Sequence, residues 1–277
     1  MTQPRDKLEQ GVSALLEPEG VSLSGIERLA SGTQSAIELV SGNSSDGIAH
    51  AFVLKRFSPQ YAYNSREAVR TEYEALSTFH RALDGANLGC KAPEPLGILE
   101  NDLAYLMRYE SGTPLSERVP ERRQVAKVCV IIIRGLDCFH RSVGAIYGDF
   151  QPGNVLLSEG RIVFLDMTIP NPFYQNEQFR RLQYFFPATD IGYWIYTVSA
   201  QFLRAFAKDS WQALKQLDMA RELVCEAAQF FAATDQAHFY ADVRAVVAAH
   251  FQRLSRGSGK GWLLSVFGRS VAVSLLR

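Results

Sequence analysis

A segment near the middle of the chain holds three residues that could bind a metal ion and activate a hydroxyl group. Residues 146–157 read IYGDFQPGNVLL and residues 161–168 read RIVFLDMT, which places Asn154 between Asp149 and Asp166. Mg²⁺ prefers oxygen ligands and often takes one or two of them from protein side chains. We expect Asn154 and Asp166 to bind the metal. We expect Asp149 to accept a hydrogen bond from an attacking hydroxyl group and to align it.

The elements around this segment would bring the three side chains together. A long apolar helix precedes Asp149, so that Asp149 lies in the loop after it, and Asn154 opens a strand. Asp166 ends the next strand, in a hairpin whose turn is residues 158–160. Oxygen ligands at two adjacent strand ends suit phosphoryl transfer, which needs in-line positioning and neutralisation of the triphosphate charge. Taken alone, Asp149 and Asn154 would be interpreted as ordinary turn residues, and only their order with Asp166 and Lys55 favours the catalytic interpretation.

The segment G-D-F-Q-P-G-N followed by F-L-D resembles the catalytic and metal-binding loops of the protein-kinase-like superfamily. It is most similar to the aminoglycoside phosphotransferase and choline kinase branch, which often reads H-G-D-x-H-P-G-N. The resemblance implies an α+β, two-lobed fold with a small β-rich N-terminal lobe and a larger helical C-terminal lobe. It also implies ATP- and Mg²⁺-dependent transfer of phosphate to a hydroxyl group. Tyr147 and Gln151 depart from the pattern, because histidine is common at both places, and Met167-Thr168 replaces Phe-Gly.

The same resemblance assigns residues to the nucleotide. Lys55 follows the apolar run AFVL, as in V-A-I-K, and would bind the α- and β-phosphates. Glu72 would orient this lysine, with Glu74 as the alternative, since the two lie about 200° apart on a helix. The phosphate-covering turn and the hinge beneath adenine complete the expected cofactor-binding set, which is Ser31, Gly32, Arg108, Tyr109 and Glu110.

Two further residues have expected roles near the catalytic loop. Asp190 resembles the aspartate that braces this loop from a helix of the second lobe, although it could equally be a helix N-terminal charge. His140 is expected to be structural, because the resemblance places a packed histidine there.

The chain changes character after a short linker at residues 110–114. The part before it shows strand patterns, and the part after it is rich in helical patterns. We therefore predict an N-terminal lobe at 1–110, with an ATP-binding sheet and one helix, and a helical lobe at 111–277, with the catalytic loop and the acceptor site. The expected helices cover 5–16, 65–83 and 121–142, and the expected strands include 35–40, 49–57, 95–99 and 103–109, with a loop at 41–47.

Composition narrows the class of protein. Lys and Arg number 29, as do Asp and Glu, so the formal net charge is zero and no nucleic-acid partner is expected. We find neither a secretory signal nor an apolar run of the roughly 18–20 residues that span a membrane. We expect a cytoplasmic protein in a reducing compartment, because the four cysteines are scattered, at Cys90, Cys129, Cys138 and Cys225.

The segment 253–277 carries basic residues beside apolar ones and no acidic residue. We keep three interpretations: a helix packed on the second lobe, a cradle for an acidic saccharide, or a peripheral contact with an anionic membrane. Membrane contact would place the protein at the inner membrane face and favour a lipid-linked acceptor such as a lipopolysaccharide core. The expected acceptor is therefore a small molecule, a sugar or a glycolipid. A pseudokinase that only binds a partner and a protein kinase are the alternative functions.

Overall fold

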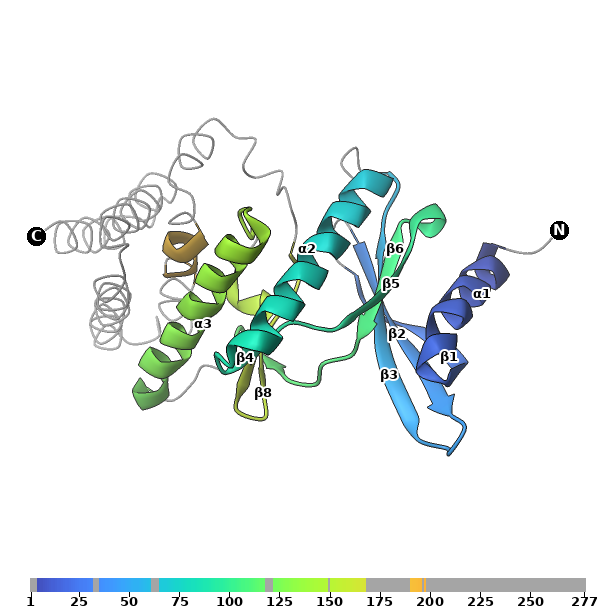
Figure 1. The fold of residues 1–277 in the computed structure, drawn as a ribbon, viewed down its shortest axis with the longest axis horizontal. Coiled ribbons are helices and arrows are strands. Elements are labelled where there is room, and N and C mark those ends of the chain that lie inside the picture. The colour runs from blue at the N-terminus through green and yellow to red at the C-terminus, as the bar shows by residue number, and fades with distance from the viewer. Residues whose placement is uncertain are drawn as a thin grey trace, which may run out of the picture. The chain divides into compact units, whose positions relative to one another are not determined.

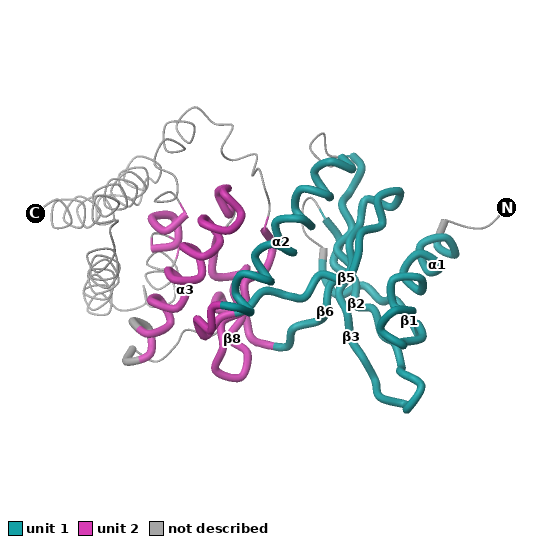
Figure 2. The backbone as a smooth tube through the Cα atoms, in the orientation of Figure 1, with its two compact units in different colours: residues 1–85, 91–111 teal, residues 86–90, 112–277 magenta. Residues whose placement is uncertain are grey.

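The computed structural model describes residues 4–31, 35–60, 65–117, 122–148, 150–167, 190–195 and 197. In this part the chain is α+β, with helices and with sheets that contain antiparallel strand pairs. The chain divides into two compact units, which Figure 2 colours separately: unit 1 is residues 1–85 with 91–111, and unit 2 is residues 86–90 with 112–277. The predicted domains, 1–110 and 111–277, stay a prediction.

Unit 1 is a five-stranded antiparallel sheet with a helix on each face (Figure 1). The strands run in the order β1 (Val21–Ser31), β2 (Ser35–Ser44), β3 (Ala49–Phe57), β6 (Ala104–Arg108) and β5 (Pro95–Leu99). The helices are α1 (Pro4–Leu16) and α2 (Arg66–Ala86), and two short 3₁₀ turns lie at η1 (Glu17–Glu19) and η2 (Glu100–Asp102). The helices and strands predicted for this part are confirmed, with ends that differ by up to four residues.

Helix α1 covers one face of the sheet. Leu8, Val12 and Leu16 recur every fourth residue, so they share one side of the helix, and all three are buried in a core with Leu54 of β3. Gly97 of β5 permits this close packing, because a Cβ atom there would lie 2.3 Å from Leu15 Cδ2.

Helix α2 covers the other face of the sheet. The Ser65 hydroxyl accepts a hydrogen bond from the Ala68 N–H at 3.1 Å, which satisfies one of the free donors at the start of the helix. Its buried residues recur at three- and four-residue spacing: Val69, Glu72, Ala75, Leu76, Phe79 and Leu83. A buried glutamate among apolar residues needs a partner, since an unpaired buried charge is very costly.

The predicted loop at 41–47 is too long. Strand β2 continues to Ser44, because residues 41–43 pair with β1 on one side and with β3 on the other. Gly42 fits here because it lacks a side chain: a Cβ atom would lie 2.4 Å from Val21 Cγ1. Pairing on both sides thus overrides the turn-forming tendency of Ser, Gly and Asn.

The described part of unit 2 contains helix α3 (Arg122–Val143) and a second sheet. The strands of this sheet run in the order β4 (Cys90–Lys91), β9 (Arg161–Phe164), β8 (Val155–Ser158) and β7 (Thr113–Pro114), and the 3₁₀ turn η3 (Pro152–Asn154) precedes β8. The long apolar helix predicted at 121–142 is confirmed, and its Ile132, Leu136 and Phe139 are buried. Residues 190–195 and 197 are also helical, in the part of the chain predicted to be rich in helices, and the other residues after 167 lie outside the described part.

Helix α3 meets β9 at Gly135. A Cβ atom on Gly135 would lie 2.4 Å from the Phe164 ring and 3.2 Å from Cys90 Sγ. We expect Gly135→Ala to lower the free energy of unfolding by about 1–3 kcal/mol through overpacking, partly offset by the better helix propensity of alanine. Gly85→Ala in α2 is the control, because a Cβ atom there meets nothing within 4 Å, and it should leave stability equal or slightly higher. Equal effects in thermal denaturation would contradict this packing.

Within the described residues, no helix combines the length and the apolar character needed to cross a membrane.

Candidate functional site

Lys55 and Glu72 form a buried ion pair in unit 1. Lys55 lies on β3 and points toward α2, where its Nζ atom is 2.6 Å from Glu72 Oε1. The two side chains are only 4% and 3% exposed. The structure thus brings together the predicted lysine and the preferred glutamate, whereas Glu74 is exposed. Their role toward a nucleotide stays a prediction.

Aromatic residues surround this ion pair. The Tyr105 hydroxyl donates to Glu72 Oε1 at 2.8 Å, so this oxygen accepts from both Tyr105 and Lys55. The Phe57 ring centroid lies 5.1 Å from Lys55 Nζ, within reach of a cation–π interaction. Tyr105 was not predicted, since it meets Glu72 only through the pairing of β6 with β3, where it lies opposite Lys55.

Removing one partner of this ion pair should destabilise unit 1. Lys55→Met would leave the Glu72 carboxylate buried without its counter-ion, so the free energy of unfolding should fall by about 3–5 kcal/mol. The double variant Lys55→Met/Glu72→Leu should recover most of that loss, since two apolar side chains can replace a buried pair. Urea denaturation of the two single variants and the double variant measures this coupling. Additive losses would contradict the buried ion pair.

The predicted hinge residues are partly engaged within unit 1. The Arg108 guanidinium group lies 2.6 Å from a Glu94 oxygen and 2.7 Å from a Glu19 oxygen, and the Glu110 carboxylate lies 2.5 Å from Lys91 Nζ. The N–H group of Arg108 donates to the Glu94 carbonyl, and that of the next residue, Tyr109, donates to a carbonyl of β3. Because these two N–H groups are engaged, a contact with adenine would use the carbonyl groups of the predicted hinge or the N–H groups of residues after Tyr109.

The expected phosphate-covering turn follows β1. Ser31 is the last residue of this strand, and Ser35 begins β2. Gly32 lies outside the described residues, so the cradle predicted from the backbone of Ser31 and Gly32 stays a prediction.

In unit 2, Asp190 holds the backbone just before Asp149. The Asp190 carboxylate accepts hydrogen bonds from the N–H groups of Tyr147 at 2.6 Å and Gly148 at 3.2 Å. It also lies 2.7 Å from His140 Nε2, and both side chains are buried. The bracing contact anticipated for Asp190 is present, and His140 is buried against it; that His140 has a structural role stays a prediction. Asp149 itself lies outside the described residues.

Aromatic packing holds the residues on either side of Asp149. Tyr147 and Phe150 are fully buried, and their ring centroids are 4.9 Å apart. Phe150 also contacts Trp194 at 5.0 Å and stacks on Phe164 of β9 at 5.5 Å. The Tyr147 hydroxyl donates to the Leu165 carbonyl at 2.7 Å, which links this segment to the residue before Asp166. Tyrosine at 147 thus has a defined structural role here.

The structure brings Asn154 and Asp166 to the ends of two adjacent strands, β8 and β9. Asn154 closes η3 just before β8, and Asp166 follows β9 by two residues. Val155 pairs with Phe164, and the Leu165 N–H donates to the Asn154 carbonyl at 2.8 Å. The backbone of Asn154 therefore touches the residue that directly precedes Asp166.

Asp166 has a left-handed backbone conformation, with φ at +60°. This conformation is uncommon for residues other than glycine, although Asp and Asn tolerate it best. Such strained residues tend to gather at functional sites, because the surrounding structure must hold them in place. The conformation of Asp166 therefore marks this chain turn as a candidate site.

The side chains of Asn154 and Asp166 carry oxygen atoms, which are the ligands that Mg²⁺ prefers. Within the described ranges, no group of three or more His, Cys, Asp and Glu side chains could hold a metal ion. A site with one carboxylate and one amide is compatible with that finding, because Mg²⁺ often takes only one or two protein ligands and keeps water and phosphate oxygens. Such a donor set suits Mg²⁺ bound together with a phosphorylated ligand.

Cys90 and Cys138 of unit 2 do not suggest a nucleophile. Burial raises the pKa of Cys90 to about 12, with a further contribution from nearby Cys138. Burial also raises the pKa of Cys138. Both thiols therefore stay protonated near neutral pH, whereas the reactive form of cysteine is the thiolate.

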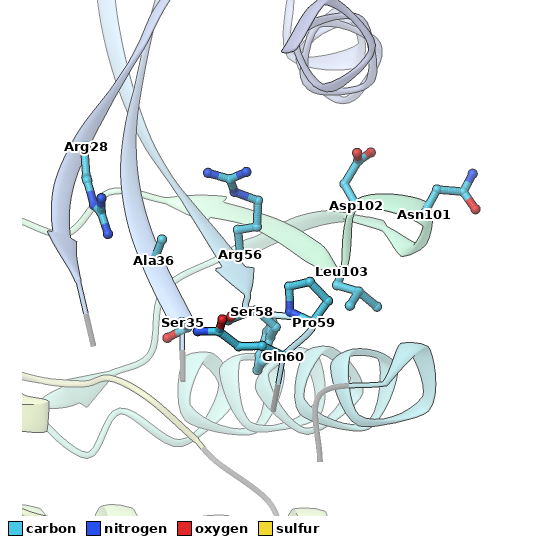
Figure 3. Close-up of a pocket in the computed structure, with 11 residues that line it drawn as sticks. Arg28, Ser35, Ala36, Arg56, Ser58, Pro59, Gln60, Asn101, Asp102 and Leu103 are labelled. Atoms are coloured by element: carbon cyan, nitrogen blue, oxygen red, sulfur yellow. The ribbon is translucent and has the colours of Figure 1, made fainter. Parts of the chain in front are cut away.

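A cavity of about 460 Å³ lies beside the start of β2, the end of β3 and the η2 turn (Figure 3). Arg28 and Arg56 project from β1 and β3 into it, and Asp102 lies at its other end. A neighbouring cavity of about 470 Å³ shares these three residues, and its lining matches three arginines with three carboxylates: Arg5, Arg28, Arg56, Glu9, Glu38 and Asp102. This balance of charge does not favour an anionic ligand, and neither cavity is lined by a predicted site residue.

No family model matches the chain, and no curated protein matches it either. The segment 253–277, Cys225 and Thr168 lie outside the described residues, so the expectations about them stay predictions.

Proposed function

We propose that this protein is an ATP- and Mg²⁺-dependent phosphotransferase with a two-lobed, protein-kinase-like fold. The observation that carries the proposal is the pairing of Asn154 with the turn that holds Asp166. The hydrogen bond from the Leu165 N–H to the Asn154 carbonyl joins the two chain segments, and Asp166 adopts a strained conformation there. One amide and one carboxylate at such a turn suit the shared coordination of magnesium by protein and phosphate.

The Lys55–Glu72 pair supports the same function from unit 1. An ion pair between a strand lysine and a helix glutamate is a recurring part of kinase-like active sites, where the lysine binds the α- and β-phosphates. In this chain the pair is buried at 2.6 Å and is held by a second donor, Tyr105. A purely structural ion pair at this position would be a weak source of stability, because burial costs both charges their hydration. Conformational specificity or ligand binding is the better reason for it.

Each residue would have a separate part in the reaction. Lys55 would hold the α- and β-phosphates as a point charge, and Glu72 would keep the lysine in place. Magnesium, when bound by Asn154 and Asp166, would neutralise charge on the triphosphate. Asp149 would accept a hydrogen bond from the acceptor hydroxyl group and align it with the γ-phosphate. Asp190 would keep the backbone before Asp149 fixed through its bonds to the N–H groups of Tyr147 and Gly148.

The acceptor class and the cellular site remain part of the proposal. We propose a hydroxyl group of a small molecule, a sugar or a lipopolysaccharide-like glycolipid as the acceptor. We place the protein in the cytoplasm. The basic segment 253–277 is the proposed contact if the acceptor is bound to the inner face of a membrane.

Nucleotide-dependent stabilisation tests the first step of this proposal. A ligand that binds only the folded protein raises the melting temperature, by an amount that grows with its concentration. We expect ATP with Mg²⁺ to raise the melting temperature of the full chain, and ATP with a chelator to raise it much less. The same melting temperature under both conditions, at millimolar ATP, would contradict a magnesium–nucleotide site.

A further inference from the structure

We propose that Tyr105 is a positioning residue for the nucleotide, which acts by fixing the Glu72 carboxylate beside Lys55. This inference rests on the proposed function, and it adds a residue that the sequence motifs do not include. Tyr105 lies on β6, directly opposite Lys55 in the β3–β6 pairing. Its side chain is almost fully buried, and its hydroxyl group donates to Glu72 Oε1 at 2.8 Å.

Two donors from different strands restrain one carboxylate oxygen. Glu72 reaches the sheet from α2, and a glutamate side chain has several rotatable bonds, so one contact alone leaves it free to pivot. Lys55 approaches Oε1 at 2.6 Å from β3, and Tyr105 approaches the same oxygen from β6. The Glu72 carboxylate is therefore held by residues of two neighbouring strands. This fixes its orientation, and with it the position of the Lys55 ammonium group.

The Tyr105 ring is itself held in place. Its centroid lies 6.2 Å from that of Phe57 and 6.0 Å from that of Tyr73, both in tilted contacts. Phe57 also lies beside the Lys55 ammonium group. The hydroxyl group thus has little freedom to move away from Glu72, as a positioning role requires.

The shared oxygen also affects how strongly Glu72 holds the lysine. A hydrogen bond from a neutral phenol stabilises the carboxylate without adding positive charge, and it takes part of the negative charge of Oε1. Lys55 is then held less tightly by Glu72, which leaves more of its attraction for phosphate. The hydroxyl group thus has two effects: it fixes the direction of the Glu72 carboxylate, and it weakens the attraction of Glu72 for Lys55. Both effects favour the binding of ATP.

Removal of the hydroxyl group tests this role. We expect Tyr105→Phe to raise the dissociation constant for ATP with Mg²⁺ about tenfold, because a hydrogen bond to a charged group is lost. Calorimetric titration measures this constant. Tyr73→Phe is the matched control: it removes the hydroxyl group of a ring that contacts Tyr105, and it should change the constant less than about twofold. Equal effects of the two variants would overturn the proposal.

Repeating the Tyr105→Phe substitution in a protein that already lacks the Glu72 carboxylate separates a positioning role from a general effect on the fold. If Tyr105 acts through Glu72, Tyr105→Phe should have less than about a twofold effect on ATP binding in a Glu72→Leu protein, because that protein has no oxygen at residue 72 for Tyr105 to hold. The same tenfold loss in both backgrounds would show that Tyr105 acts by another route.

A measurement without nucleotide tests the contact itself. The shifts in urea midpoint for Tyr105→Phe and Glu72→Leu should be non-additive in the double variant, because either substitution alone already removes the hydrogen bond that the two groups share. Additive shifts would overturn the inference whatever the protein binds. A wild-type protein that binds no ATP but shows non-additive shifts would instead overturn the proposed function, and with it the positioning role.

Discussion

The Asp166→Asn variant is expected to lose most of its magnesium-dependent binding of ATP and to turn over about a thousandfold more slowly. The substitution exchanges the proposed charged metal ligand for a neutral one, and a bound metal ion contributes several kcal/mol of charge stabilisation in phosphoryl transfer. Asparagine tolerates the left-handed conformation that Asp166 adopts at φ +60°. The loss should therefore come from the missing charge and not from a changed backbone.

A comparison with alanine separates these two causes. Asp166→Ala removes the carboxylate and also places a residue with a Cβ atom and no local hydrogen-bonding group in a left-handed conformation, at a cost of about 1–2 kcal/mol. We expect both variants to lose magnesium-dependent binding, measured by titration of ATP with and without a chelator, and only Asp166→Ala to be clearly less stable in thermal denaturation. Wild-type affinity for ATP with Mg²⁺ in Asp166→Asn would show that Asp166 does not bind the proposed metal ion.

The Asp149→Asn variant is expected to keep its affinity for ATP and to lose turnover by about 10²–10⁴-fold. This range is typical when a group that accepts a proton or a hydrogen bond from the reacting atom is removed. The residues on either side should stay in place, since the Asp190 carboxylate holds the N–H groups of Tyr147 and Gly148 and Phe150 is buried among aromatic rings. An unchanged affinity with a large loss of rate is the signature of an interaction made in the transition state.

The control for Asp149 is the same substitution at an exposed site. Asp84 lies on the exposed side of α2, and Asp84→Asn should leave both affinity and turnover unchanged. Turnover of Asp149→Asn within a few-fold of the wild type, measured with the same acceptor, would show that another residue aligns the hydroxyl group.

The resemblance predicted the ion pair of unit 1, and local patterns singled out its two residues. Lys55 ends an apolar run typical of a buried strand, and Glu72 recurs with Ala75, Leu76 and Phe79 on one side of a helix. The apolar run before Lys55 and the helical spacing around Glu72 each involve residues close together in the chain, and such short-range patterns can be detected from periodicity. The bracing role of Asp190 could be anticipated only from the resemblance, because its partners Tyr147 and Gly148 lie more than 40 residues away.

Features that depend on distant pairing could not be predicted. Tyr105 meets Glu72 only because β6 aligns with β3 in one register, and nothing near Tyr105 in the sequence specifies that register. Strands β4 and β7 have two residues each, which is too short to show an alternating pattern. The left-handed conformation of Asp166 also gave no signal, since aspartate is common in ordinary turns.

The most direct test of the account follows the γ-phosphate itself. Purified protein would be incubated with γ-labelled ATP, Mg²⁺ and, in turn, sugars, amino alcohols, aminoglycosides and lipopolysaccharide fragments. The account predicts that the label appears on a hydroxyl group of one acceptor class, and that a chelator or the Asp149→Asn substitution abolishes the transfer. A folded protein that binds ATP with Mg²⁺ but labels none of these acceptors, or that labels only protein, would contradict it.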